Sequence, residues 1–243
     1  MPRIARIVAE GFPHHVTQRG NNREDVFFDD ADRAVYLGLL RREAERHDLA
    51  VLGYCLMTNH VHLVAVPERA DSLAKAIGRA HYFYTRYANR RYKRSGHLWQ
   101  NRFFSCALDE MQLLVALRYV DRNPVRARLV RRAWRYPWSS AALHAGVGAT
   151  PAKASALVDF HQWSEISAGL DWRQVLIEAD DAEEAEALRE RTRTGWPLGS
   201  ARFVKALEKK YGRPLAPLPR GRPRKSSGDK ARAARTRKRG RKR

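Results

Sequence analysis

Residues 51–66 have the sequence VLGYCLMTNHVHLVAV, and this stretch decides the fold. Two short apolar runs, 51–57 and 60–66, flank the turn-forming pair Thr58-Asn59, and Pro67 follows the second run. Apolar runs joined by a tight turn are typical of an antiparallel hairpin. The stretch therefore predicts two paired strands, with His60 at the start of the second.

The second strand carries the motif His60-Val61-His62. Alternation places both imidazoles on one face of the strand, while Val61 and Leu63 point to the opposite, helix-covered face. Two neutral imidazoles at this spacing can hold one divalent cation. For an isolated His-x-His motif, however, two strand histidines without a ligand are the more frequent alternative.

The flanking segments alternate between strand and helix patterns. Asp29, Asp30 or Asp32 can cap the first helix, and Asp109 or Glu110 can open the last. The expected order is a strand at 15–19, a helix from about 30 to 47, the hairpin, a helix at 72–93, a strand at 98–108 and a helix from 110 towards 123. This order indicates an α+β fold, a ferredoxin-like split βαβ sandwich whose antiparallel sheet is covered by helices on one face.

We expect three parts along the chain. Residues 1–145 form the catalytic domain, and a loop at 146–151 begins a helical C-terminal extension over 146–212, with helices at 171–192 and 201–211. Residues 213–243 contain fourteen Lys or Arg and a single acidic residue. With so few apolar residues, this last part is predicted to be a disordered, basic DNA-anchoring tail.

The charge of the chain favours a polyanionic partner. Its 47 Lys and Arg against 26 Asp and Glu give a net charge of +21, and basic groups that neutralise phosphates release counterions. No apolar stretch is long enough to span a membrane, so nucleic acid is the expected partner. Cys55 and Cys106 are too few for a disulfide framework, which favours a cytoplasmic, nucleoid-associated protein.

Tyr119 and Asn123 are four residues apart on the last helix of the predicted domain. This spacing brings both side chains to one helix face, although Pro124 predicts that the helix ends near Asn123. A phenol can attack phosphorus, and an amide oxygen can bind a metal. The alternative is that Tyr119 covers the sheet and Asn123 caps the helix.

Together these motifs resemble the single-tyrosine transposases of the HUH class, and most closely the REP-associated tyrosine transposases. The resemblance spans about residues 3–142, with a weaker echo at 195–199 and 221–224. It is carried by FPHHVTQRGNN at 12–22, MTNHVHLV at 57–64, LWQNRF at 98–103, RYVDRNPVRA at 118–127 and WSS at 138–140.

The resemblance implies a metal-dependent endonuclease and strand transferase that acts on single-stranded DNA. His60, His62 and Asn123 would hold Mg²⁺ or Mn²⁺, and Tyr119 would attack a phosphodiester to form a 5′-phosphotyrosine. It also implies hairpin-forming palindromic repeats as substrates, the ferredoxin-like fold and no nucleotide cofactor. We expect a monomer, with a dimer as the alternative.

Basic and aromatic residues alternate around these motifs, as in proteins that bind single strands or hairpins. Tyr84 and Tyr87 are as compatible with the core as with this surface. The candidate DNA contacts are Arg19, Asn21, Asn22, Arg79, Tyr82, Arg86, Arg90, Arg91, Trp99 and Arg102.

Two alternatives compete with a tyrosine transferase. The first is a non-catalytic DNA-binding regulatory or architectural protein derived from a transposase, in which the four chemical residues are vestigial. The second is a two-histidine phosphoesterase that uses water; it needs a second His-x-His or His-x-Thr motif beside His60-Val61-His62, and we identify neither.

Overall fold

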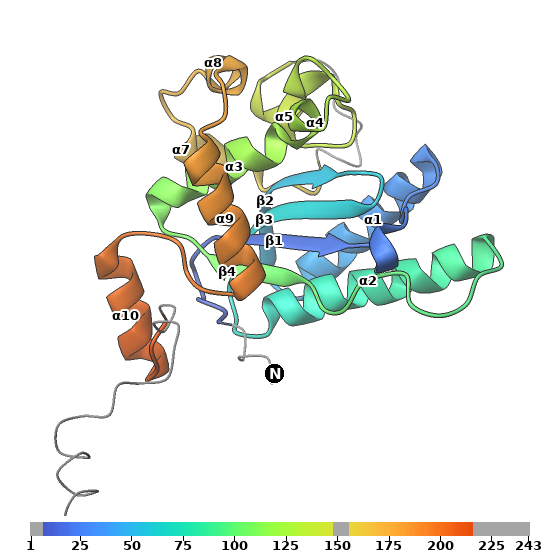
Figure 1. Cartoon of the computed structure of the whole chain (residues 1–243), viewed down its shortest axis with the longest axis horizontal. Coiled ribbons are helices and arrows are strands. Elements are labelled where there is room, and N and C mark those ends of the chain that lie inside the picture. The colour runs from blue at the N-terminus through green and yellow to red at the C-terminus, as the bar shows by residue number, and fades with distance from the viewer. Residues whose placement is uncertain (1–6, 148–155, 216–243) are drawn as a thin grey trace, which may run out of the picture.

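A computed structural model describes residues 7–147 and 156–215. Its centre is a four-stranded antiparallel sheet in the order β2-β3-β1-β4 (Figure 1). The strands are β1 (His14–Arg19), β2 (Leu49–Leu56), β3 (His60–Pro67) and β4 (Phe104–Ala107). This order confirms the ferredoxin-like sandwich, and the β2–β3 pair confirms the hairpin.

Helices α1 (Asp30–Arg46) and α2 (Ser72–Arg91) cover one face of the sheet. α1 begins at the expected place because the Asp29 side chain accepts a hydrogen bond from the Asp32 backbone N–H. Both helices bury their apolar sides against alternate strand residues such as Val16, Val61 and Leu63. Burial of this apolar surface is the main favourable contribution to the free energy of folding.

The opposite face is also partly covered, which corrects the expectation of helices on one face only. α3 (Glu110–Asp121) packs on β2 and β3, and α9 (Ala182–Thr194) packs on β4 and β1. β2 is buried along almost its whole length, so its second face also needs apolar partners. The extension predicted at 146–212 supplies much of that cover.

Shorter helices complete this second layer. Three tryptophans, Trp134, Trp163 and Trp172, lie in its core. The elements are η1 (Asn21–Arg23), α4 (Asn123–Arg126), η2 (Ala133–Arg135), α5 (Ala141–His144), α7 (Phe160–Ile166), α8 (Trp172–Ile177) and α10 (Ala201–Tyr211). None of the helices in the described ranges is long and apolar enough to cross a membrane.

Two predicted elements differ from the structure. The helix expected at 171–192 is two helices, α8 and α9, because the Asp181 side chain caps a new N-terminus and Asp180 turns to pair with Arg122. The strand expected at 98–108 is reduced to β4, because residues 104–107 form the continuous ladder with β1, whereas Trp99 forms an isolated bridge with Gly20. The tail at 213–243 lies almost entirely outside the described residues.

His81 gives the stability of this fold a pH dependence. Its ring is buried under Trp99, with the Tyr36 hydroxyl 3.0 Å from Nε2, and burial lowers its pKa to about 3. In the unfolded chain His81 becomes protonated near pH 6.5, whereas in the folded chain it stays neutral at that pH. The contribution of His81 to the free energy of unfolding is therefore complete above pH 6.5 and is lost as the pH falls towards 3.

We expect His81→Gln to remove this part of the pH dependence. Between pH 6 and pH 5, the free energy of unfolding of the wild type should fall by about 1 kcal/mol more than that of the variant. Urea unfolding at the two pH values measures the difference. His97→Gln, at an exposed histidine, is the control and should keep the wild-type slope. Equal slopes for His81→Gln and the wild type would contradict the prediction.

Candidate active site

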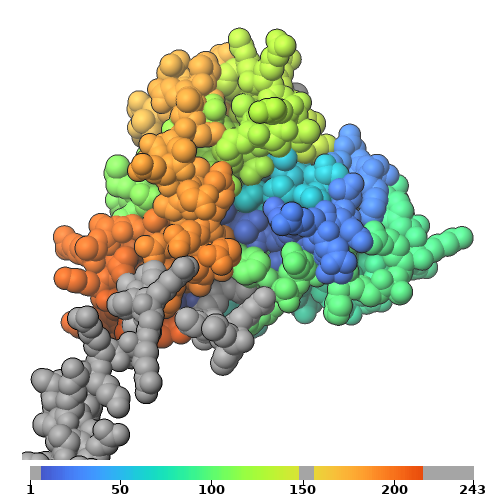
Figure 2. All heavy atoms as spheres, in the orientation of Figure 1, coloured from blue at the N-terminus to red at the C-terminus, as the bar shows by residue number. Residues whose placement is uncertain are grey.

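A cavity of about 440 Å³ lies on the sheet face that α3 and α9 leave open. In Figure 2 the orange surface of α9 borders the blue surface of the N-terminal strand region on this side of the molecule. Alternate residues of three strands supply His15, Thr17, Arg19, His60, His62 and Phe104. The helical layer supplies Tyr119, Asn123, Arg126, Arg189, Thr192 and Arg193.

His60 and His62 are neighbours on β3, and both line this cavity. Their ring centroids are 5.0 Å apart, with the ring planes at 83°. Burial lowers the pKa of His60 to about 4 and that of His62 well below its usual value. Both rings are therefore neutral near pH 7, which is the form that binds a metal.

Hydrogen bonds fix the proton of the His60 ring. The side-chain N–H of Asn59 donates to the Arg23 carbonyl at 2.9 Å, so the amide oxygen of Asn59 is turned towards His60. That oxygen lies 2.7 Å from His60 Nδ1, which therefore carries the proton and donates. Nε2 of His60 keeps its lone pair, as a metal ligand requires.

Tyr119 enters the cavity from α3 and is 8% exposed. Its ring centroid lies 5.7 Å from that of His62 and 5.7 Å from that of His15. The Arg126 guanidinium stacks 3.8 Å from the ring centroid, and Arg189 Nε donates to the hydroxyl oxygen at 3.3 Å. This hydrogen bond raises the pKa of Arg189, so a charged guanidinium is held beside the phenol.

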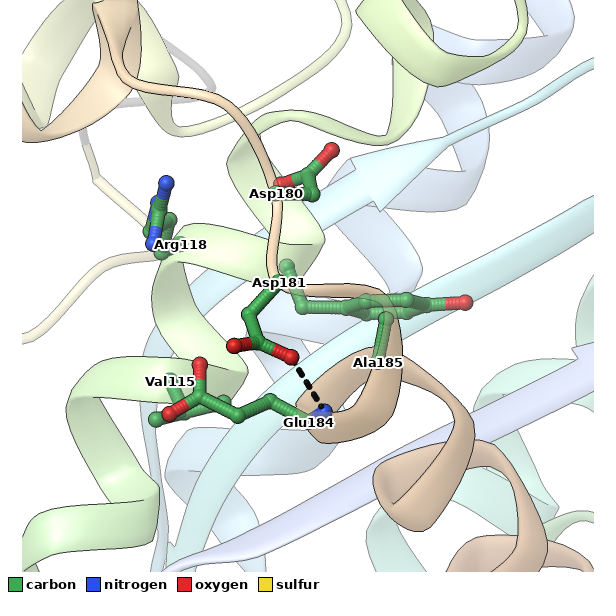
Figure 3. Close-up of a pocket in the computed structure, with 7 residues that line it drawn as sticks. Val115, Arg118, Asp180, Asp181, Glu184 and Ala185 are labelled. Atoms are coloured by element: carbon green, nitrogen blue, oxygen red, sulfur yellow. Dashed lines mark hydrogen bonds between the residues drawn. The ribbon is translucent and has the colours of Figure 1, made fainter.

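A second, much smaller hollow of about 10 Å³ also borders Tyr119. It is formed where α3 meets the start of α9, and Figure 3 shows Arg118 and Asp181 at this junction, with the Asp181 carboxylate turned towards Glu184. The dashed line marks the hydrogen bond from the Glu184 backbone N–H to the Asp181 carboxylate, 3.0 Å. The N-terminal cap of α9 thus lies next to the helix that carries Tyr119.

Asn123 lines the same cavity although the helix is interrupted before it. α3 ends at Asp121, and Asn123 begins the short helix α4 with Pro124 in its first turn. The break follows from Pro124, which has no backbone N–H to donate to the carbonyl four residues earlier, so the hydrogen-bond ladder of α3 cannot continue past this point. The four-residue spacing still brings Asn123 and Tyr119 into the same cavity.

The residues of the cavity fit a divalent cation, but only with ligands beyond side chains. In the described ranges, no group of three or more His, Cys, Asp or Glu is arranged to hold a metal. Two imidazole nitrogens and the Asn123 amide leave coordination positions for water and phosphate oxygens. The guanidinium groups of Arg19, Arg126 and Arg189 give the cavity a positive character that suits a phosphodiester.

The predicted DNA contacts near the hairpin lie close to this cavity. Arg19 lines it, and Asn21 and Asn22 form the turn η1 directly after β1. The Gly20 N–H donates to the Asn59 carbonyl, which ties this turn to the start of the histidine strand. Asn22 has φ +50°, a left-handed conformation that asparagine tolerates, and Arg102 is exposed.

The predicted contacts on α2 lie on the helix that covers the opposite sheet face. Tyr82 is 56% exposed with the Arg86 guanidinium 5.7 Å from its ring centroid, and Arg90 is exposed. Arg79 is bonded to Glu43, and Arg91 pairs with Asp29 and Asp32. Tyr84 is fully buried.

Trp99 is 8% exposed and stacks on His81 in the core. A buried indole cannot offer its face to an unpaired base, so we leave Trp99 out of the candidate DNA surface.

Sequence reasoning missed several residues of the cavity. His15-Val16-Thr17 is a His-x-Thr motif on β1, and Thr17 pairs with His62 in the sheet register. This motif corrects the expectation that no second His-x-His or His-x-Thr motif occurs. However, the two His15 ring nitrogens lie 2.7 Å from Thr192 Oγ1 and 3.0 Å from His62 Nδ1. With both nitrogens engaged, His15 is not placed as a second catalytic histidine, and the phosphoesterase alternative gains nothing.

Arg189 and Thr192 had no sequence signal, because they come from a helix that is distant along the chain and belongs to no recognised motif. Arg126 lies within the RYVDRNPVRA stretch but was not singled out. Only the packing of α9 on β1 and β4 brings Arg189 and Thr192 to the cavity.

One solved structure among the comparisons agrees with this architecture. A solved REP-associated tyrosine transposase, bound in that structure to a REP hairpin, matches with a TM-score of 0.52 and 16% identity, over 62% of this chain and 90% of that chain. A proposed transposase from Deinococcus radiodurans matches with a TM-score of only 0.35 and 18% identity, over 50% of this chain and 97% of that chain. No curated protein sequence matches the chain. Residues 10–123 match the family described as IS200-like transposase. This part of the chain, just under half of its length, is therefore similar to the IS200-like transposase family.

Proposed function

We propose that this protein is a metal-dependent endonuclease and strand transferase that cuts single-stranded DNA through Tyr119. One observation carries the proposal: the Tyr119 phenol, the His60 and His62 rings and Asn123 line a single cavity together with several guanidinium groups. A vestigial site in a DNA-binding regulator would have no need to keep these side chains together.

The cation would be held by Nε2 of His60, by Nε2 of His62 and by the Asn123 amide oxygen. When bound, Mg²⁺ or Mn²⁺ would neutralise charge on the scissile phosphate and help to orient it. Mn²⁺ should serve at least as well as Mg²⁺, because imidazole suits Mn²⁺ better than it suits Mg²⁺.

The protein's own residues supply the nucleophile and the positive charge that binds the phosphate. Arg126 and Arg189 hold the Tyr119 ring, and the charge of both stabilises negative charge on the phenol oxygen. That oxygen bonds to phosphorus and gives up its proton to solvent, while the bond to the 3′-oxygen breaks and this oxygen takes up a proton. The products are a 5′-phosphotyrosine and a free 3′-hydroxyl, and reversal with another 3′-hydroxyl joins strands.

We propose hairpin-forming palindromic repeats as the substrates, in line with the DNA held by the solved relative. Arg19, Asn21, Asn22 and Arg102 would contact the strand near the cavity. The tail at 213–243 would anchor the protein to DNA through phosphate contacts and so associate it with the nucleoid. A monomer carries every residue of the proposed site in one chain.

A labelling experiment tests this function. The substrate is a hairpin-bearing single strand taken from palindromic repeats near the coding sequence, labelled at either its 5′ or its 3′ end and incubated with Mn²⁺. We expect the 3′ label to become covalently attached to the protein and the 5′ label to appear on a shorter free strand with a 3′-hydroxyl. A matched strand with a scrambled repeat is the control. Binding of the hairpin with no covalent adduct from either label would favour the non-catalytic regulator.

A further inference from the structure

Helix α9, which is distant along the chain, contacts a histidine on the sheet face that lines the cavity. Thr192 is 2% exposed, and its Oγ1 lies 2.7 Å from Nδ1 of His15, a residue 177 positions earlier. We propose that Thr192 positions the His62 ring through His15, so that α9 becomes part of the metal site. This inference rests on the proposed role of His62 as a ligand. α9 lies outside residues 10–123, the part that matches the transposase family.

The direction of the hydrogen bonds is fixed at the α9 end. Thr192 Oγ1 lies 2.7 Å from the Leu188 carbonyl oxygen, which can only accept, so the hydroxyl proton points there. The same oxygen can then only accept from its other partners. His15 Nδ1 must therefore carry a proton and donate it to Thr192, and the Cys106 thiol at 3.2 Å donates to Thr192 as well.

The direction continues through His15 to His62. The buried His15 ring faces Thr192 and His62 rather than a carboxylate, so it is neutral, and a proton on its Nδ1 leaves Nε2 as an acceptor. Nε2 of His15 lies 3.0 Å from Nδ1 of His62, and the two rings are stacked with their planes at 11°. His62 Nδ1 therefore donates, and His62 keeps the lone pair on Nε2. Thr192 and His15 thus fix the tautomer and the orientation of His62 together.

The two candidate metal ligands, His60 and His62, differ in which residues fix the proton of the ring. The proton of His60 is fixed by Asn59, its neighbour in the sequence, within the family-matched range. The proton of His62 is fixed by a residue of the C-terminal extension. A change at Thr192 should therefore alter His62 and leave His60 unchanged.

The first test needs neither metal nor DNA. Long-range ¹⁵N–¹H NMR of the full chain at pH 7.5 reports which ring nitrogen of each histidine carries the proton. We expect the Nδ1–H tautomer for His15, His60 and His62 in the wild type. In Thr192→Val, which has nearly the same shape but no hydroxyl, we expect His15 and His62 to shift towards Nε2–H while His60 does not change. A wild-type His62 in the Nε2–H form would overturn the inference.

The second test measures the affinity for Mn²⁺ alone, by electron paramagnetic resonance of the free ion. We expect Thr192→Val to bind Mn²⁺ about 10- to 100-fold more weakly, which is the usual effect of losing a group that orients a ligand. Thr192→Ser restores the hydroxyl and should bind as the wild type does. Thr194→Val is the matched control. The Thr194 hydroxyl also donates a hydrogen bond to a carbonyl four residues earlier on α9, but it is Thr192 whose hydroxyl lies against His15.

His62→Ala distinguishes a failure of the positioning role of Thr192 from a failure of the ligand role of His62. If His62→Ala loses Mn²⁺ binding and Thr192→Val keeps it, the positioning role of Thr192 is wrong and the proposed function stands. If His62→Ala binds Mn²⁺ as the wild type does, the ligand role of His62 is wrong, and the inference fails with it.

Discussion

Tyr119→Phe should abolish DNA cleavage while leaving DNA binding nearly intact. The substitution removes only the hydroxyl that would bond to phosphorus, so we expect the rate of strand cleavage to fall by more than about 1,000-fold. The ring can still pack between Arg126 and Arg189. One lost hydrogen bond is worth about 1 kcal/mol, so the affinity for a hairpin strand should stay within about tenfold. Single-turnover cleavage and a filter-binding titration measure the two quantities.

A second tyrosine provides the control for this substitution. The hydroxyl of Tyr136 donates to the Leu56 carbonyl at 2.8 Å, and Tyr136 does not line the cavity. Tyr136→Phe also loses one hydrogen bond, so it should lower stability by about 1 kcal/mol and leave the cleavage rate unchanged. Cleavage by Tyr119→Phe at the wild-type rate would show that the phenol is not the nucleophile.

The largest stability effect is expected at Asp121, between Tyr119 and Asn123 in the sequence. Its carboxylate is fully buried and accepts hydrogen bonds from Ser140 Oγ at 2.7 Å and from Trp172 Nε1 at 2.9 Å. His144 Nδ1 lies 2.7 Å from the same carboxylate, and His144 Nε2 lies 2.9 Å from the Leu52 carbonyl. Both ring nitrogens of His144 thus face acceptors, so the ring is held between the Asp121 carboxylate and the Leu52 carbonyl.

Asp121→Asn should destabilise the protein by about 3 kcal/mol, because it turns an amide N–H towards a buried donor and leaves buried hydrogen-bonding groups unsatisfied. For a chain of this size we expect the melting temperature to fall by about 10 °C. Urea unfolding and calorimetry at pH 7.5 measure the loss.

Two variants show whether this loss is specific to the buried network. Trp172→Phe removes one donor and part of a buried ring, and it should lower the free energy of unfolding by less than Asp121→Asn. Asp25→Asn, at an exposed carboxylate, should change stability by no more than about 0.5 kcal/mol. A loss below about 1 kcal/mol for Asp121→Asn would mean that the network is not a major stabilising element.

The secondary structure of the domain could be predicted because its signals are local. The Thr58-Asn59 turn between two apolar runs specified the hairpin, and Asp29 and Asp109 capped helices that begin at the expected residues. The helix at 171–192 was predicted wrongly, since a continuous run of helix-forming residues does not show that Asp181 begins a second helix. Trp99 was placed among the DNA contacts because its neighbours are basic, and its burial depends on packing against His81 and Phe27.

The sequence by itself determined the order of strands and helices, the face of β3 on which His60 and His62 lie, and the break before Asn123. These features depend on the two-residue period of a strand, on side-chain caps and on the missing backbone N–H of Pro124, which all act within a few residues. Only the tertiary structure decided that α3 and α9 cover the second face of the sheet, and that Arg189 meets Tyr119 while Thr192 meets His15. These contacts join residues 70 and 177 positions apart, and they form because the two-sided burial of the sheet requires apolar partners that no local pattern names.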